Sequence, residues 1–167
     1  MQIVLARIDE RLIHGQLLVS WTKKLHAQRI IVVDDVLSED AFARSVMMMT
    51  VPVTVRVEVI SVEAAAILLA HTSPDDDDLR TILLFRSPEA VFRLHKVGFS
   101  VKSLNLGCMS ARLGRIRITG HVYASESEIR MLREMEDDGM EIYLQVVYAE
   151  TKLMLDKALA SSGIVRG

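Results

Sequence analysis

The chain has 167 residues, of which 50% are hydrophobic and 25% charged, with a formal net charge of −2. This composition excludes an intrinsically disordered chain, and the near-neutral charge with only 5% aromatic residues argues against a nucleic-acid binder. The length predicts one domain over residues 1–167. A single Cys108 excludes an internal disulfide, and no apolar run is long enough to span a bilayer. We therefore expect a cytoplasmic protein without membrane insertion.

Short β-rich runs alternate with helical patterns along the whole chain. The expected strands cover residues 2–6, 29–33, 53–60, 81–85, 103–106, 116–118 and 141–147. The expected helices cover residues 15–26, 39–49, 62–70, 88–97, 126–138 and 151–160. This alternation predicts an α/β fold with an open, mostly parallel central sheet of about seven strands and helices on both faces. Such sheets carry their sites at the carboxyl ends of the strands, here expected at Arg7, Asp34-Asp35, Arg86-Ser87 and Gly107 to Ser110.

Several helix boundaries carry local signals. Ser38 is a candidate N-cap for the second helix, and Ser87 precedes a proline at the first helical position of the fourth. The run Ser125-Glu126-Ser127-Glu128 predicts a capping box, and Gly139 is expected to end that helix. The run Asp75-Asp76-Asp77-Asp78 predicts a solvated loop, because ligands for hard cations are usually spaced rather than contiguous.

The segment after the first strand, Arg7-Ile8-Asp9-Glu10-Arg11-Leu12-Ile13-His14-Gly15-Gln16, is the most informative part of the chain. It places His14 at the start of a helix, whose free N–H groups favour an anion. Arg7 and Arg11 add guanidinium groups suited to phosphate oxygens, and Gly15 lets the backbone approach whatever the imidazole carries. The residues favour a site for a phosphorylated histidine. A half-buried packing histidine beside surface ion pairs is the alternative.

The same segment, followed by Trp21, resembles the signature Arg-Ile-Asp-Asp-Arg-Leu-Ile-His-Gly-Gln of one protein family. That family comprises the IIB components of the mannose/fructose/sorbose class of the bacterial phosphoenolpyruvate-dependent sugar phosphotransferase system (PTS). Further landmarks follow in family order and spacing: Ile30-Ile31-Val32-Val33-Asp34-Asp35, Ser61-Val62-Glu63 with Ala65, Ser87-Pro88-Glu89 and Asn105-Leu106-Gly107-Cys108-Met109-Ser110. The chain departs from the pattern at Glu10, where Asp is commoner, at Cys108, where Gly or Asn is frequent, and at residues 147–150.

The resemblance implies a phosphocarrier that acts as a protein phosphohistidine–sugar phosphotransferase. His14 would accept a phosphoryl group on Nδ1 from the IIA component. It would then pass the group to a sugar held in the membrane-embedded IIC/IID permease, with which the protein would associate peripherally. The resemblance makes Arg11 the phosphate-binding catalytic residue, and Arg7 matches another basic residue of the active loop that is also expected to be catalytic. It also implies phosphate-binding or cleft positions at Asp9, Gly15, Gln16, Gly107 and Ser110.

No small-molecule cofactor is expected, and no metal, because no histidine or cysteine has metal-ligand spacing to another. The resemblance also makes a homodimer conceivable, since family members often pair. Two other functions stay open. One is a regulatory module that binds phosphate or a nucleotide on the same fold without covalent chemistry. The other is a structural subunit that has lost transfer.

Overall fold

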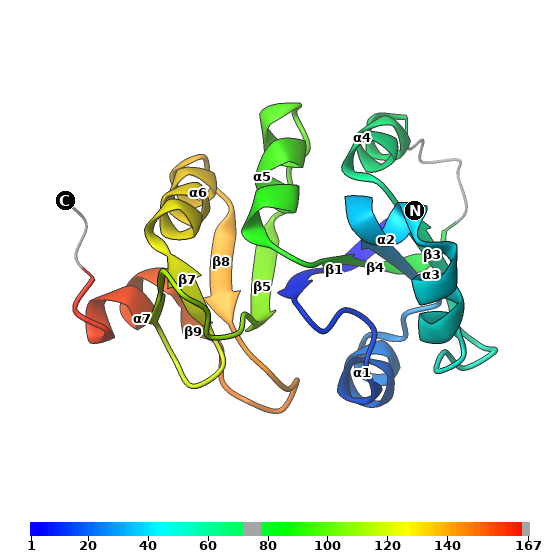
Figure 1. Cartoon of the computed structure of the whole chain (residues 1–167), viewed down its shortest axis with the longest axis horizontal. Coiled ribbons are helices and arrows are strands. Elements are labelled where there is room, and N and C mark those ends of the chain that lie inside the picture. Colours follow the sequence, from blue (N-terminus) through cyan, green and yellow to red (C-terminus); the bar gives the residue numbers. More distant parts are fainter. Residues whose placement is uncertain (72–77, 165–167) are drawn as a thin grey trace.

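The computed structural model describes residues 1–71 and 78–164. Of the acidic run predicted to form a solvated loop, Asp75-Asp76-Asp77 lies outside the described residues, and Asp78 is exposed. Figure 1 shows a sheet that crosses the length of the molecule, with helices above and below it.

The central sheet has seven strands in the order β3-β2-β4-β1-β5-β8-β9. Their bounds are β1 (Gln2–Asp9), β2 (Arg29–Val33), β3 (Arg56–Ile60), β4 (Arg80–Phe85), β5 (Ser103–Cys108), β8 (Glu141–Leu144) and β9 (Leu153–Met154). All neighbouring pairs are parallel except β8 and β9, which are antiparallel. The prediction of an open, mostly parallel sheet of about seven strands is therefore confirmed. The first strand lies at its centre, between β4 and β5.

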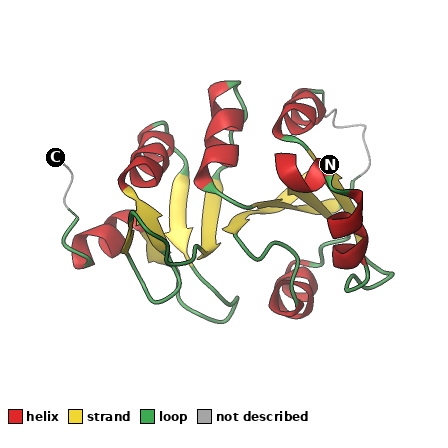
Figure 2. Cartoon of the chain, in the orientation of Figure 1, coloured by secondary structure: helices red, strands yellow, loops and turns green. Residues whose placement is uncertain are grey.

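Helices cover both faces of this sheet, as expected (Figure 2). Their bounds are η1 (Leu17–Trp21, a π-helix), α1 (Thr22–Leu25), α2 (Asp35–Glu39), α3 (Ala41–Met48), α4 (Val62–Ala70), α5 (Pro88–Lys96), α6 (Glu126–Asp137) and α7 (Leu155–Ser161). One hydrophobic core contains buried residues of α4, α5, α6 and α7, and a second contains those of η1 and α2.

Strand β2 shows why the sequence contains continuous apolar runs. Ile31 and Val33 belong to the first core, whereas Ile30 and Val32 belong to the second. Successive side chains of a strand point to opposite faces, so a strand covered on both faces is apolar at every position. All five residues of β2 are buried.

The strand predictions differ from the structure in several places. The strand expected over residues 141–147 ends at Leu144. Residues 116–118 do not join the central sheet, because β6 (Arg115–Arg117) pairs with β7 (Tyr123–Ser125) in a separate two-stranded sheet. The seventh strand of the central sheet is β9, which lies where the last helix was expected to begin. The strand expected over residues 53–60 begins only at Arg56. A short apolar run indicates a strand but does not specify its partner.

The second expected helix differs most from the structure. Helix α3 (Ala41–Met48) lies within the expected range 39–49, whereas α2 (Asp35–Glu39) precedes it and was not predicted. The two helices are capped by Asp34 and Asp40, respectively. Their carboxylates accept the N–H groups of Leu37 and Ala43 at 2.7 and 2.8 Å. Ser38 lies inside α2 and is not a cap, so that prediction was wrong. An aspartate at the end of a strand, where the backbone is extended, is as good an N-cap as serine.

Two other helix starts follow the sequence. The capping box at Ser125 is present, with its hydroxyl accepting from the Glu128 N–H and the Glu128 carboxylate accepting from the Ser125 N–H. Helix α6 ends before Gly139, whose φ of +98° favours glycine. Ser87 is the N-cap of α5 by position, but its side chain makes no capping hydrogen bond there.

Candidate active site

The site forms where β1 leaves the sheet. Strand β1 was expected to end at residue 6, but it continues to Asp9. Arg7 and Asp9 are two residues apart in a strand, so their side chains share one face. Both are fully buried, and the Arg7 Nη2 atom lies 2.8 Å from Asp9 Oδ2. Charged residues at the end of an apolar run look like a loop in sequence, whereas here they neutralise one another inside the protein.

The Asp9 carboxylate is the centre of the site, because three basic side chains donate to it. Arg7 donates through Nε and Nη2, and Arg11 donates through Nε, Nη2 and its backbone N–H. His14 Nε2 lies 3.1 Å from Asp9 Oδ2. Burial opposes ionisation, but the hydrogen bonds from His14 and Arg11 and the charge of Arg7 hold the pKa of Asp9 well below its usual range. The carboxylate is therefore an anion.

The ionised state of Asp9 determines how the imidazole of His14 is protonated. A carboxylate can only accept hydrogen bonds, so His14 Nε2 must carry the proton of their 3.1 Å contact. In the neutral ring the lone pair is then on Nδ1. The His14 side chain is 16% exposed. The arrangement gives a partly accessible imidazole with a fixed orientation and a nucleophilic Nδ1.

Arg11 is the basic residue at the surface of the site. Its side chain is 41% exposed, although Nε and Nη2 bind the buried Asp9. Among the residues that the structure describes, its Nη1 atom has no hydrogen-bond partner. An anchored guanidinium with free N–H groups suits a phosphate oxygen. The phosphate-binding role expected of Arg11 stays a prediction.

Arg7 is placed differently from the expectation. The sequence suggested a phosphate ligand, but the guanidinium is fully buried. Besides Asp9, it donates to the Asn105 side chain and to the carbonyl oxygens of Gln145 and Val146. The Trp21 ring lies over it, with its centroid 4.9 Å from Arg7 Cζ. All these contacts lie inside the protein, so Arg7 orients Asp9 rather than meeting solvent.

Gly107 makes room for this guanidinium. A Cβ atom at Gly107 would lie 2.6 Å from Arg7 Nε and closer still to Cζ and Nη2. Real Cβ atoms do not approach other heavy atoms so closely, so only glycine fits there. The expected role of Gly107 at the phosphate cleft is thus replaced by a packing role beneath Arg7.

Ser110 was expected at the phosphate cleft, together with Gly107. The backbone N–H groups of residues 109 and 110, which follow β5, are bound within the protein. Met109 donates to the carbonyl of His121, and the Ser110 N–H donates to Glu10 Oε2 at 2.9 Å. Gly15 and Gln16 are exposed at the start of the helical segment, and a Cβ at Gly15 would meet nothing within 4 Å. The loop is therefore open on the side of Gly15.

Glu10, one of the departures from the family pattern, links the His14 loop to the segment after β5. Its side chain is 7% exposed, and the carboxylate accepts from Arg115 Nη1 at 2.6 Å and from the Ser110 N–H. Arg112 Nη2 lies 3.2 Å from the same carboxylate as an ion pair. Arg115 in turn donates through two nitrogens to Glu128 at the start of α6. These partners keep the pKa of Glu10 low against the opposing effect of burial. Sequence reasoning assigned none of these partners.

The other two departures also acquire structural roles. Burial raises the pKa of the Cys108 thiol, and the nearby Asp9 charge adds to this shift, which agrees with a packing role for Cys108. In the segment 145–150, Glu150 Oε2 accepts the N–H groups of Val146 and Val147. This closed turn presents the two carbonyls that bind Arg7.

Leu12 gives the loop a conformation that the sequence did not indicate. Its φ is +53°, in the left-handed region that a branched residue rarely adopts. Its side chain is 4% exposed, and its N–H donates to the Asp9 carbonyl at 2.9 Å. Burial of Leu12 compensates for the strained turn that brings His14 back to Asp9.

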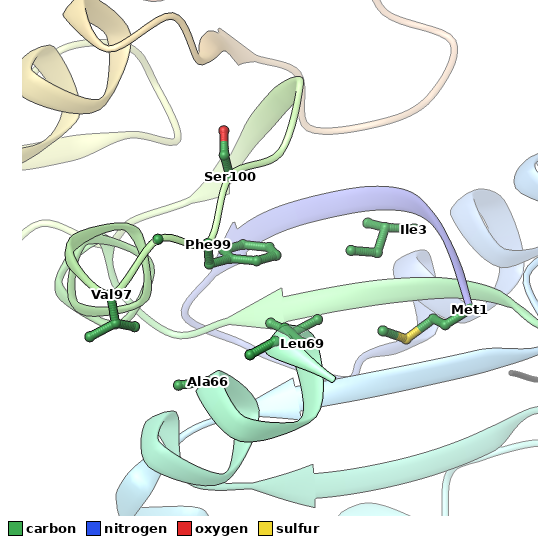
Figure 3. Close-up of a pocket in the computed structure, with 9 residues that line it drawn as sticks. Met1, Ile3, Ala66, Leu69, Val97, Phe99 and Ser100 are labelled. Carbon is green, nitrogen blue, oxygen red and sulfur yellow. The ribbon is translucent and has the colours of Figure 1, made fainter. Parts of the chain in front are cut away.

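One hollow with several apolar lining residues is not part of this site. A pocket of about 310 Å³ lies between α4, the segment after α5 and the start of β1 (Figure 3). Met1, just before β1, and Ile3 in β1 line it, and Leu69 and Phe99 face them (Figure 3). His14 follows the other end of β1, so the pocket lies at the amino end of the sheet.

Within residues 1–71 and 78–164, no group of three or more His, Cys, Asp or Glu side chains is arranged to hold a metal ion. No helix in this part of the chain is both long and apolar enough to cross a bilayer.

Comparison with known proteins identifies the family. Residues 3–166 match the family model of the PTS system sorbose subfamily IIB component. The chain belongs to this IIB family. It is 35% identical over 158 residues to the sorbose-specific EIIB component of Klebsiella pneumoniae, covering 94% of this chain and 95% of that protein. The crystal structure of the IIBSor domain of the Klebsiella pneumoniae sorbose permease superposes with a TM-score of 0.87 at 32% identity, covering 96% and 98% of the two chains.

A second relative is a longer protein, named as an EIIAB component. The mannose-specific EIIAB component of Escherichia coli K12 is 34% identical over 155 residues, which cover 93% of this chain but 47% of that protein. The present chain thus spans about half the length of this relative. Membership of the IIB family agrees with the resemblance read from the segment 7–16.

Proposed function

We propose that this chain is a phosphocarrier of a sugar phosphotransferase system, and that His14 carries the phosphoryl group. The observation that carries this proposal is the contact between His14 Nε2 and the ionised Asp9, which leaves Nδ1 as the nucleophile. The family match over residues 3–166 supports one IIB domain along the chain. A non-covalent phosphate- or nucleotide-binding module is not favoured, because the relatives are named as PTS components.

In the first step the lone pair of His14 Nδ1 attacks the phosphorus of a phosphohistidine on the IIA component. The N–P bond of the donor breaks, and its electron pair returns to the donor imidazole. The Nε2 proton of His14 stays on the hydrogen bond to Asp9 before and after transfer, so the site needs no rearrangement. The mannose-specific EIIAB relative supports IIA as the partner.

In the second step a sugar hydroxyl oxygen attacks the phosphorus, and the N–P bond on His14 breaks. The electron pair returns to Nδ1, and the hydroxyl proton passes to a base in the permease. We propose that the sugar is held by a IIC/IID permease and that this chain reaches the membrane by docking to it. Formation of a homodimer is a separate proposal that the transfer steps do not require.

The charged residues have distinct roles in this proposal. Arg11, exposed and anchored by Asp9, stabilises the negative charge of the transferring phosphoryl group. Asp9 orients the imidazole and fixes its tautomer. Arg7 is a positioning residue, since its contacts are with Asp9 and buried acceptors. Gly15 and Gln16 lie at the open side of the loop, where the two partners would approach.

The test is phosphorylation by phosphoenolpyruvate, enzyme I, HPr and the IIA component of the same transport system. Acid-labile phosphate should appear on His14 and be absent from His14→Ala. The exposed His71, which follows α4, provides the control, and His71→Ala should be labelled like the wild type. Arg11→Gln should fold normally and be labelled at least about tenfold more slowly. Absence of label on the wild type with a competent IIA would refute the proposal.

A further inference from the structure

Three exposed guanidinium groups converge on the loop that carries His14. Arg11 and His14 bind the same oxygen of Asp9. Arg112 lies 3.2 Å from the Glu10 carboxylate. Arg86 pairs with Asp34 at 2.5 Å, and its Nη1 atom lies 3.5 Å from the Glu10 carbonyl. These arginines come from three separate segments, after β1, after β4 and after β5, and we call them the arginine rim.

Each arginine of the rim is exposed, whereas the carboxylate that holds it is buried. The side chains of Arg11, Arg86 and Arg112 are 41%, 44% and 61% exposed. Those of their partners Asp9, Asp34 and Glu10 are 0%, 6% and 7% exposed. A molecule that approaches His14 therefore meets cations first, with the compensating anions beneath them. Buried carboxylates also hold the long side chains in place, which reduces the entropy lost on binding.

The net charge of the whole cluster is small and positive. Arg7, Arg11, Arg86, Arg112 and Arg115 face Asp9, Glu10, Asp34 and Glu128, which leaves a charge of +1 on a chain of −2. Two other acidic side chains lie outside this set. Asp35 forms its own pair with Arg93 at 2.6 Å. Glu150 keeps its negative charge, accepts two backbone N–H groups and belongs to the 145–150 turn rather than to the His14 loop.

We propose that the arginine rim is the docking surface for the phosphorylated IIA donor and that the arriving phosphoryl group reverses its charge. A phosphoryl group carries about two negative charges at neutral pH, so on His14 it changes the cluster from +1 to about −1. This inference rests on the proposed function.

The consequence is directional. The unphosphorylated chain presents a positive rim to a donor that carries the phosphoryl dianion, so the two attract. After transfer the donor has lost that charge and the rim is compensated, so the attraction between the products is weaker. The permease meets only the phosphorylated form, in which the rim is compensated. For this reason the rim fits the donor rather than the permease.

Neutralising variants test the rim without touching the phosphate-binding Arg11. For Arg112→Gln, which leaves Glu10 paired with Arg115, kcat/KM for phosphorylation by phospho-IIA should fall about threefold, chiefly through KM. The double variant R86Q/R112Q should lose about tenfold at low salt, and R86K/R112K should stay within about twofold of the wild type. Arg56, 64% exposed at the amino end of β3, is the matched control, and Arg56→Gln should leave the rate unchanged.

Salt provides the second measurement. Added salt screens charges over about 10 Å, so it should slow phosphorylation by phospho-IIA more steeply than the reverse transfer to IIA. Equal salt dependence in both directions would overturn the proposal, as would a double variant as fast as the wild type. The proposal would also be overturned if the double variant transferred its phosphoryl group to sugar in permease vesicles more slowly but was phosphorylated by phospho-IIA at the wild-type rate. In all three cases His14 is still labelled, whereas failure of the proposed function leaves it unlabelled.

Discussion

The contact between Gly107 and Arg7 allows a quantitative prediction. Gly107→Ala adds one methyl group that would lie 2.6 Å from Arg7 Nε and closer to the rest of the guanidinium. Arg7 cannot move aside easily, because Asp9, Asn105 and two backbone carbonyls hold it and Trp21 covers it. The methyl group must therefore displace either the guanidinium or strand β5.

The cost follows from two physical terms. Overpacking of a tight interior costs about 1–3 kcal/mol, and each hydrogen bond to a charged group contributes about 1.5–3 kcal/mol. If the displaced guanidinium loses one such bond, the free energy of unfolding should fall by about 3–5 kcal/mol. For a chain of this size, each kcal/mol shifts Tm by about 2–4 °C, so Tm should fall by roughly 6–20 °C.

Thermal unfolding followed by circular dichroism measures this change. Gly120→Ala is the control, because its Cβ would meet only Arg117 Nη2, at 3.9 Å. The rate of His14 phosphorylation, measured at a temperature where both variants are folded, should fall for Gly107→Ala alone, since Asp9 loses its support. A Tm for Gly107→Ala within about 2 °C of the Gly120→Ala value would show that the close packing reasoning is wrong.

Two further predictions concern the carboxylates of the His14 loop. Asp9→Asn leaves Arg7 without its buried counter-charge and should cost about 3–5 kcal/mol near neutral pH. Folding lowers the pKa of Asp9, so the stabilisation by its carboxylate is complete above the unfolded pKa of about 4 and is lost as the pH falls. In urea unfolding, the free energies of unfolding of the wild type and Asp9→Asn should therefore converge in acid. A difference between them that does not change with pH would contradict this. Glu10→Asp should cost about 1–2 kcal/mol in the same assay, because the shorter arm cannot reach Ser110, Arg112 and Arg115 together. Glu10→Asp with wild-type stability would show that this reach is unimportant.

The most accurate predictions from the sequence are those of helices whose ends are set by residues close by in the chain. Helix α4 has the expected bounds, and α5 and α6 are each within one residue of them. Proline at the first position of α5 and the capping box of α6 are local signals, and the structure contains both. Helix α2 was missed because the sequence predicted a single helix start with Ser38 as its N-cap, whereas the structure starts α2 at Asp34 and α3 at Asp40.

The candidate site was only partly predictable, because some of its contacts join residues that are far apart in the sequence. The segment 7–16 identified His14 and Arg11 as neighbours, and the structure joins them through Asp9. The burial of Arg7 was missed, because its acceptors Asn105, Gln145 and Val146 are far along the chain. One signal was present, since Arg7 and Asp9 at alternate positions next to an apolar strand can pair on one face.

The geometry of the loop was beyond local reasoning. A positive φ is expected at glycine or asparagine, but the structure places it at Leu12, where burial overrides the local preference. The arginine rim likewise required the sheet order, since Arg86 and Arg112 meet residue 10 only because β4 and β5 flank β1.

The distant anchors of Arg7 also have a consequence for biosynthesis. Arg7 leaves the ribosome before its acceptors, which follow 98, 138 and 139 residues later. Contacts of such long sequence separation form slowly and late in folding. Until Asn105 and the 145–150 turn have docked, Arg7 lacks these acceptors and the Arg7–Asp9 pair lacks its buried setting. The site around His14 therefore depends on a segment that is synthesised more than 130 residues after it.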